Sequence, residues 1–161
     1  MRRKDREIAD IDEKIKIIQK CKVCRLGLSE NNRPYIIPLN YGYDFENENL
    51  TLFFHSAREG KKIEIIKNNN HACFEVDCDG KLIEAENACA HGYTFRSIIG
   101  FGKIFFVENT GEKIYGLNRI MIHQTGKETI HDFSQDALEK VVVYKLVVEE
   151  FTGKQKELPK E

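Results

Sequence analysis

This sequence lacks the features that mark several classes of protein. Its 161 residues carry a net charge of −1 at pH 7 with acids and bases interleaved, so no surface for nucleic acid or an anionic membrane is predicted. No apolar run approaches the ~20 residues of a membrane-spanning helix, and no segment resembles a signal peptide. Neither G-x-G-x-x-G nor a P-loop is present, so a Rossmann dinucleotide site or an NTPase is unsupported. We expect a cytoplasmic protein.

Cysteine usage gives no clear metal or redox signature. The five cysteines are an odd number in a chain without a secretion signal, so free thiols are expected. Cys21 and Cys24 form a C-x-x-C pair, but no second pair of this kind supplies the other ligands of a zinc site. Cys89 and His91 lack an identifiable third group for nucleophilic catalysis. We therefore favour buried or idle thiols over zinc or a redox disulfide, and predict no metal site.

The periodicity of apolar residues predicts a single α+β domain over residues 1–161, centred on a β-barrel. Ile8, Ile11, Ile15 and Ile18 recur at helical spacing and indicate an N-terminal helix within residues 1–20, from about Asp5 to Lys20. Short turns join the first three strands, which favours an antiparallel meander. The predicted strands cover residues 21–28, 35–43, 50–55, 71–76, 94–108 and 141–151; helices cover 56–69, 110–126 and part of 131–140; 152–161 is a solvated tail.

The most informative stretch is the junction at which the third strand runs into the second helix. Ser56 and Glu59 fit the capping box S-x-x-E, which predicts Ser56 as the N-cap. The amides and dipole of such a helix start attract negative charge. These residues are compatible with a phosphate site beside an imidazole, and equally with an ordinary capped helix and solvated lysines. The surrounding basic groups are His55, Arg58, Lys61 and Lys62.

Pro38 interrupts the second predicted strand, which covers residues 35–43. Proline has no N–H to donate to a strand ladder. The chain at this point must therefore lie at a sheet edge, form a bulge, or be a strand that is open towards another group.

Five motifs carry a resemblance to a known family. They are the opening MRRKDREI, Pro38-Leu39-Asn40-Tyr41-Gly42-Tyr43, Phe54-His55-Ser56-Ala57-x-x-Gly60-Lys61-Lys62, Tyr93-x-x-Arg96-Ser97-Ile98-Ile99-Gly100-Phe101-Gly102-Lys103, and Phe151-Thr152-Gly153-Lys154. They resemble the nitroimidazole-resistance (Nim) proteins of the pyridoxamine 5′-phosphate oxidase-like, FMN-binding split-barrel superfamily. The most specific part is H-S-A-x-x-G-K-K in register with P-L-N-x-G-Y.

The resemblance implies a mainly β, Greek-key split barrel with flanking helices, which forms a homodimer with FMN at the interface. It implies that the flavin phosphate lies against the third-strand–helix junction and that the second strand runs along the flavin ring, for which an incompletely paired strand at Pro38 would leave room. Arg96 and Ser97 would complete the pocket, from the same chain or from the partner subunit. The other implied cofactor-binding residues are Pro38, Leu39, Asn40, Tyr41, His55, Ser56, Ala57, Lys61 and Lys62.

The function that the resemblance implies is an FMN-dependent oxidoreductase that reduces nitroimidazole-like or other small electron-poor substrates. The flavin would carry the redox chemistry and the protein would bind and orient it. His55 is the candidate catalytic residue, because an imidazole can donate a proton near neutral pH; a purely structural hydrogen bond is its alternative role. The alternative functions are a non-catalytic flavin- or haem-binding module and a pyridoxamine 5′-phosphate oxidase.

Overall fold

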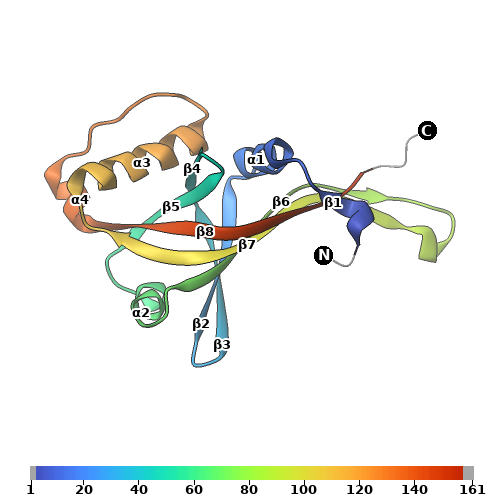
Figure 1. Cartoon of the computed structure of the whole chain (residues 1–161), viewed down its shortest axis with the longest axis horizontal. Helices are drawn as coiled ribbons and strands as arrows, with labels where there is room; N and C mark the ends of the chain where they lie inside the picture. Colours follow the sequence, from blue (N-terminus) through green and yellow to red (C-terminus); the bar gives the residue numbers. More distant parts are fainter. Residues whose placement is uncertain (1–2, 158–161) are drawn as a thin grey trace.

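An antiparallel sheet that curls on itself forms the centre of the molecule (Figure 1). The computed structural model describes residues 3–157, and within them eight strands join one sheet in the order β3-β2-β6-β7-β8-β5-β4, with β1 added to β8. The strands are β1 (Glu7–Ile8), β2 (Val23–Glu30), β3 (Arg33–Asn40), β4 (Gly42–Glu46), β5 (Asn49–Ala57), β6 (His71–Ile83), β7 (Gly92–Val107) and β8 (Val141–Lys156). The helices are α1 (Ile11–Lys20), α2 (Lys61–Asn68), α3 (Thr110–Thr125) and α4 (Gln135–Lys140), with 3₁₀ turns at Lys4–Arg6 and Ala88–Ala90.

The two edge strands of this sheet meet at Tyr41. β3 ends at Asn40 and pairs with β2, whereas β4 begins at Gly42 and pairs with β5, at the opposite end of the sheet. Tyr41 is fully buried and its hydroxyl donates to the Ile18 carbonyl oxygen at 2.6 Å. The single predicted strand over residues 35–43 is therefore wrong, because the chain passes from one sheet edge to the other within it. This crossing makes a barrel that is open along one side.

The inward faces of the strands form the main core. Phe54, Phe74, Leu26 and Tyr144 are fully buried there, and the rings of Phe54 and Tyr144 stack with centroids 5.5 Å apart. Successive side chains of a strand point to opposite faces of the sheet, so every second one is directed into this core. A second cluster lies on the outer face, where Val107, Leu117, Leu138 and Val143 pack beneath α3 and α4.

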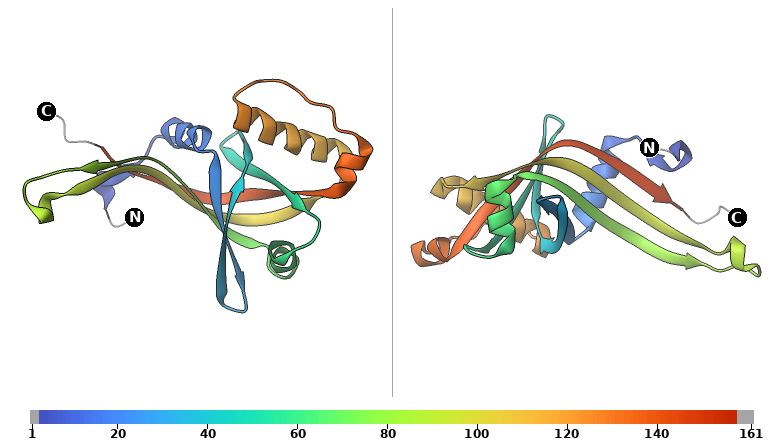
Figure 2. Two further views of the ribbon diagram at one scale, coloured as in Figure 1. Left: turned by 180° about the vertical axis from the view of Figure 1, so that it is seen from behind. Right: turned by 90° about the horizontal axis from the view of Figure 1, so that it is seen from below.

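The helices cover different parts of the barrel. α3 and α2 lie on opposite sides of the β7–β8 ribbon (Figure 2), and α2 buries Ile63, Ile65 and Ile66. Helix α1 begins only at Ile11, because the Asp10 side chain caps it by accepting from the Asp12 N–H at 2.8 Å. The residues before this cap form a 3₁₀ turn and β1, so the predicted helix start near Asp5 is wrong and its end at Lys20 is confirmed.

The long strands extend beyond their predicted ends. β6 and β7 form an arm that projects from the barrel (Figure 1), with a bulge between Cys78 and Lys81. β8 pairs with β7 as far as Lys156, so the predicted solvated tail is wrong for residues 152–156; residues 158–161 lie outside the described part. Local sequence did not reveal this extension because its partners, β7 and β1, are distant in the chain.

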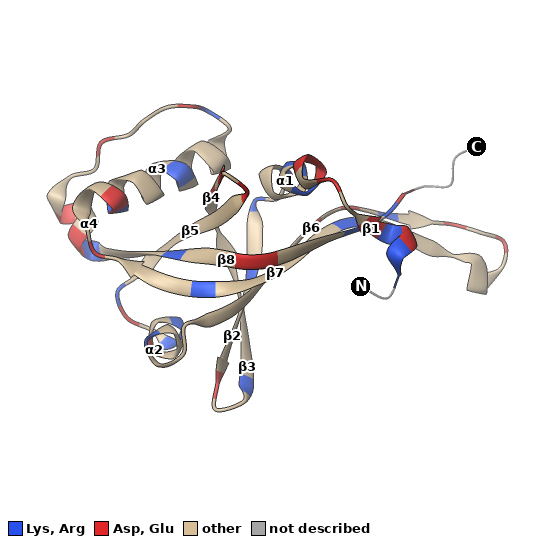
Figure 3. Cartoon of the chain, in the orientation of Figure 1, with Lys and Arg blue, Asp and Glu red and all other residues tan. Residues whose placement is uncertain are grey.

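Charged residues of both signs are distributed along the elements (Figure 3). Among residues 3–157, no helix combines the length and the apolar character needed to cross a membrane.

Candidate functional site

The junction between β5 and α2 differs from its prediction at the cap. Ser56 lies in β5, opposite Val142 of β8, and its hydroxyl donates to the Ala57 carbonyl oxygen at 2.9 Å. The helix begins at Lys61, with Gly60 at the N-cap. The predicted capping box of Ser56 and Glu59 is wrong, because β5 continues to pair with β8 through Ala57 before the chain turns.

The start of α2 is left without a side-chain cap. Gly60 has φ 127° and ψ 165°, a conformation that is accessible essentially to glycine alone, and it offers no side-chain acceptor. Its carbonyl oxygen accepts from the N–H groups of Ile63 and Glu64 at 2.9 and 3.2 Å. The first N–H groups of a helix have no partner within it. Within residues 3–157, the N–H groups of Lys61 and Lys62 have no such partner and remain available to an anion, which the helix dipole favours at this end.

The three cations near this helix start have different environments. Lys61 forms a salt bridge with Glu30 of the β2–β3 hairpin, with 2.7 Å between Nζ and Oε2. Arg58 turns away and donates to the Glu139 carbonyl oxygen at 2.8 Å. Lys62 is half-buried and forms no ion pair with any of residues 3–157. Lys62 is therefore the cation that is free to neutralise an anion at α2.

Two strand edges near the junction carry unpaired backbone groups. β4 pairs with β5 only over Asn49–Phe53, which leaves Phe54–Ala57 without a partner on that side among residues 3–157. The outer edge of β3 is likewise unpaired. Pro38 lies on this edge strand, exposed and opposite Arg25 of β2, so the sheet edge is the one of its three predicted settings that the structure shows. Such edges offer hydrogen-bond donors and acceptors to a planar polar ligand.

A family model described as pyridoxamine 5′-phosphate oxidase matches residues 10–155. The chain belongs to this family. A comparison with curated protein sequences found no match. The expected split-barrel fold, mainly β with flanking helices, is confirmed for this pyridoxamine 5′-phosphate oxidase family member. The family is a flavin-binding one.

Solved structures agree with this membership. A candidate 5-nitroimidazole antibiotic resistance protein of Bacteroides thetaiotaomicron is 30% identical, with a TM-score of 0.79 over 94% of this chain and 90% of that one. This similarity bears out the resemblance to nitroimidazole-resistance proteins. Two others share the fold: the flavocytochrome Anf3 of Azotobacter vinelandii (17% identity, TM-score 0.80, 99% and 73% covered) and an FAD-binding protein of Mesorhizobium loti (21%, 0.68, 94% and 98%).

Within the family fold, the predicted second-strand residues contribute mainly backbone. Tyr41 is buried and Leu39 packs against the core, so neither side chain faces the open edge. The Asn40 amide donates to the Lys22 carbonyl oxygen at 3.1 Å and to Gln124 Oε1 at 3.0 Å. Any ligand along this strand would therefore use the peptide groups of residues 38–41.

His55 and Ser56 point to opposite faces of β5. His55 is exposed on the outer face, on which its neighbour Phe53 packs against the Tyr115 ring of α3. Partial desolvation lowers the pKa of His55 because it disfavours the charged imidazolium. Ser56 lies on the inward face beside Tyr144, whose buried hydroxyl has no hydrogen-bond partner among residues 3–157. The imidazole can thus exchange protons at the surface, whereas the serine borders the core.

One copy of the chain does not bring Arg96 and Ser97 to this junction. Arg96 lies near the start of β7, 11 residues before Val107, and Val107 is the end that lies near His55 through Val143 of β8. At about 3.3 Å per residue, this strand separates Arg96 from the junction by on the order of 35 Å. Arg96 instead pairs with Glu13 of α1, with 2.6 Å between Nη2 and Oε2, while its buried Nε has no partner among residues 3–157.

The C-x-x-C pair is buried within this fold. Cys24 lies in the core, and Cys21 Sγ contacts the Asp77 carbonyl oxygen at 3.3 Å. Burial raises the pKa of both thiols to about 12. Thiols in this state are poor nucleophiles, because the reactive thiolate is rare.

His123 is a buried structural residue, whereas its sequence context favours a solvated or locally hydrogen-bonded histidine. It lies on the buried face of α3, and its Nδ1 and Nε2 are 2.7 and 3.0 Å from the carbonyl oxygens of Tyr41 and Gln19. It thereby joins α3 to α1 and to the strand crossing at Tyr41. Its place three residues after Ile120, on one helix face, was the available signal.

The stability of this protein should fall as the pH falls through the range in which His123 titrates. Burial lowers the pKa of His123 below its ordinary 6.5, and this outweighs the two carbonyl oxygens that favour the imidazolium. The unfolded state then binds more protons, so the stabilisation is present above about pH 6.5 and is lost below it. Urea unfolding between about pH 7.5 and about pH 5.5 measures this slope.

His123→Gln provides the comparison. It should lower the free energy of unfolding at high pH by roughly 1–3 kcal/mol, because a buried carbonyl oxygen loses its donor, and it should flatten the slope. A slope equal to that of the parent protein would show that another group causes the pH dependence.

Proposed function

We propose that this chain is an FMN-dependent oxidoreductase that acts as a homodimer on small electron-poor substrates, nitroimidazole-like compounds among them. The observation that carries the proposal is the uncapped start of α2, with Lys62 unpaired, beside the free edges of β3 and β5. A site of this kind suits a ligand with one phosphate group and a planar ring with polar atoms. The similarity to the Bacteroides protein supports the substrate class.

The residues of the junction would divide the binding of FMN between them. The first N–H groups of α2 and the Lys62 ammonium would hold the phosphate. The backbone of residues 38–41 and 54–57 would hydrogen-bond the polar edge of the ring. Bound FMN would supply the electron transfer. His55 would donate a proton to the reduced substrate from the protein surface.

A second copy of the chain fits the outer face of the sheet. Four large apolar side chains there are 38% to 50% exposed, on adjacent strands β7 and β8. An exposed apolar patch on a sheet commonly marks an interface. A partner subunit would cover this face and could bring its own Arg96 and Ser97 to a flavin site that this copy leaves incomplete. The patch consists of Ile99, Phe101, Phe105 and Val147.

Lys62→Ala should weaken FMN binding by about 10- to 150-fold, because it removes a charge-assisted contact worth about 1.5–3 kcal/mol. Lys61→Ala is the matched control and should have a smaller effect, since Lys61 is engaged by Glu30. Fluorescence titration of the apoprotein with FMN and with riboflavin measures the affinities of both variants and of the parent protein. Equal affinities for FMN in the parent and in Lys62→Ala would place the phosphate elsewhere.

Spectroscopy and reduction test the reaction itself. The purified protein should show flavin absorption bands, and the extracted cofactor should chromatograph as FMN and not as FAD. NADH or NADPH should bleach the band without oxygen, and a 5-nitroimidazole should restore it. A haem band in place of a flavin band, or a bound flavin that no donor reduces, would contradict the proposal. Turnover of pyridoxamine 5′-phosphate would favour the oxidase alternative.

A further inference from the structure

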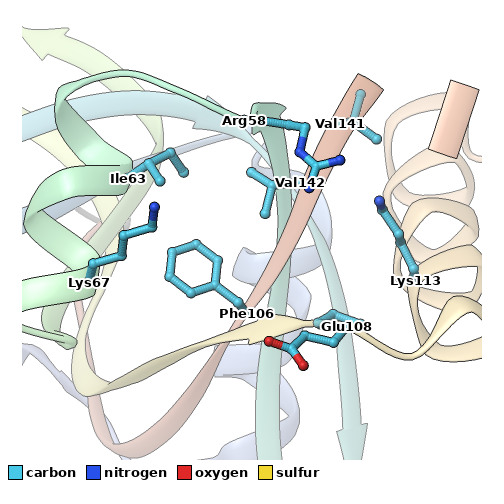
Figure 4. Close-up of a pocket in the computed structure, with 9 residues that line it drawn as sticks. Arg58, Ile63, Lys67, Phe106, Glu108, Lys113, Val141 and Val142 are labelled. Atoms are coloured by element: carbon cyan, nitrogen blue, oxygen red, sulfur yellow. The ribbon is translucent and has the colours of Figure 1, made fainter. Parts of the chain in front are cut away.

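A cavity of about 450 Å³ lies on the β8 side of the β5–α2 junction (Figure 4). It opens between α2, the start of α3 and the ends of β7 and β8. None of its lining residues belongs to the positions proposed for FMN. The side chains that line it include Arg58, Lys67, Lys113, Glu108, Phe106 and Val142.

Cationic side chains outnumber acidic ones around this cavity. Lys67 reaches it from α2, and Arg58 and Lys113 reach it from the opposite side, with Phe106 between them (Figure 4). None of these three cations forms a salt bridge with any side chain among residues 3–157, and Glu108 is the one carboxylate in the lining. The lining therefore carries three positive charges and one negative charge, and the Glu139 carboxylate acts on Lys113 from outside it.

Backbone contacts fix two of these cations in position. Arg58 donates to the Glu139 carbonyl oxygen at 2.8 Å, and the Lys113 ammonium donates to the Leu138 carbonyl oxygen. These two carbonyl groups lie in the last turn of α4, and the C-terminal end of a helix favours cations. Because a guanidinium has five N–H groups, Arg58 keeps donors for a ligand. Burial and the charge of Arg58 lower the pKa of Lys113, which a bound anion would offset.

The remaining walls are apolar. Phe106 presents a ring, and Val142 and Ile63 lie beside it. Ligand cavities commonly combine such walls with a few charged groups that fix orientation. We propose that this cavity binds a small organic anion, a phosphate or carboxylate on a flat apolar body, at a site separate from that of FMN. The assignment does not depend on the proposed oxidoreductase function.

Calorimetric titration of the full chain with phenyl phosphate tests the site. One phenyl phosphate should bind per chain, and benzyl alcohol, which lacks the charge, should not bind. Lys67→Glu should weaken phenyl phosphate at least tenfold, because it reverses a charge at an exposed side chain without breaking any described contact. Lys127→Glu, at an exposed lysine after α3, is the matched control and should bind like the parent protein.

A second variant and a competition with FMN complete the test. Arg58→Gln should also weaken phenyl phosphate, and its circular dichroism should match that of the parent protein. The affinity should be the same with saturating FMN as without it. Failure of phenyl phosphate to bind, unchanged binding by Lys67→Glu, or displacement by FMN would each overturn a separate anion site. The absence of FMN binding would refute the proposed function and leave this test intact.

Discussion

Gly42→Ala should lower the free energy of unfolding by about 3 kcal/mol or more. A Cβ atom at Gly42 would lie 2.3 Å from the Arg119 carbonyl carbon and 2.4 Å from the Ile120 nitrogen. Both are backbone atoms of α3, so no side-chain rotation relieves the overlap. The helix or β4 must move instead. Urea unfolding, monitored by circular dichroism, measures the change.

The displacement would reach beyond the substituted residue. α3 is held on β4 by Arg119, whose Nε lies 2.6 Å from Asp44 Oδ1 and also donates to the Tyr43 carbonyl oxygen at 3.0 Å. Moving α3 outward breaks these contacts and disturbs the strand crossing at Tyr41. FMN affinity should therefore fall together with stability, because the crossing aligns the free edges of β3 and β5.

Gly27→Ala is the matched control. It lies in β2, and a Cβ there would meet the Cys73 carbonyl oxygen at 3.5 Å, an ordinary contact distance. Its cost should stay within about 1 kcal/mol. If Gly42→Ala and Gly27→Ala unfold at the same urea concentration, then α3 does not approach β4 as closely as the structure indicates.

The sequence predicted those features that local pattern determines. Apolar residues at helical spacing located α3, and Pro38 indicated a sheet edge as one of three settings, because proline lacks the N–H that a paired strand donates. The same kind of reasoning failed at Ser56. A capping box is a local preference, but β5 continues through Ala57 because β8, far along the chain, pairs with it. The extension of β8 to Lys156 was missed for the same reason.

The candidate site was likewise predicted only where it depends on local sequence. Lysines after an apolar strand pointed to an anion, and the structure places them at a helix start. Which lysine is free depends on partners that the local sequence does not reveal. Glu30 engages Lys61, and the end of α4 draws Arg58 away. His123 was predicted to be solvated or locally hydrogen-bonded because its two acceptors, on α1 and at Tyr41, are distant in the chain. Such contacts exist only once the barrel has closed.

Phe101→Glu should convert the proposed dimer into a monomer. Phe101 is 50% exposed in the apolar patch on β7 and β8, where a partner subunit would bury it. A carboxylate in that position would lose its hydration without gaining a partner, at a cost of several kcal/mol. Sedimentation velocity at micromolar concentration should show the parent protein as a dimer and the variant as a monomer.

FMN binding should decrease along with dimerisation. If the partner's Arg96 and Ser97 complete each flavin site, Phe101→Glu should weaken FMN at least tenfold although it lies outside the junction. Ile130→Glu is the control, because Ile130 is 70% exposed in the loop after α3, away from the sheet face. It should remain dimeric and bind FMN normally. A monomeric Phe101→Glu with full affinity would mean that each chain holds its flavin alone, so that Lys62 and the strand edges suffice.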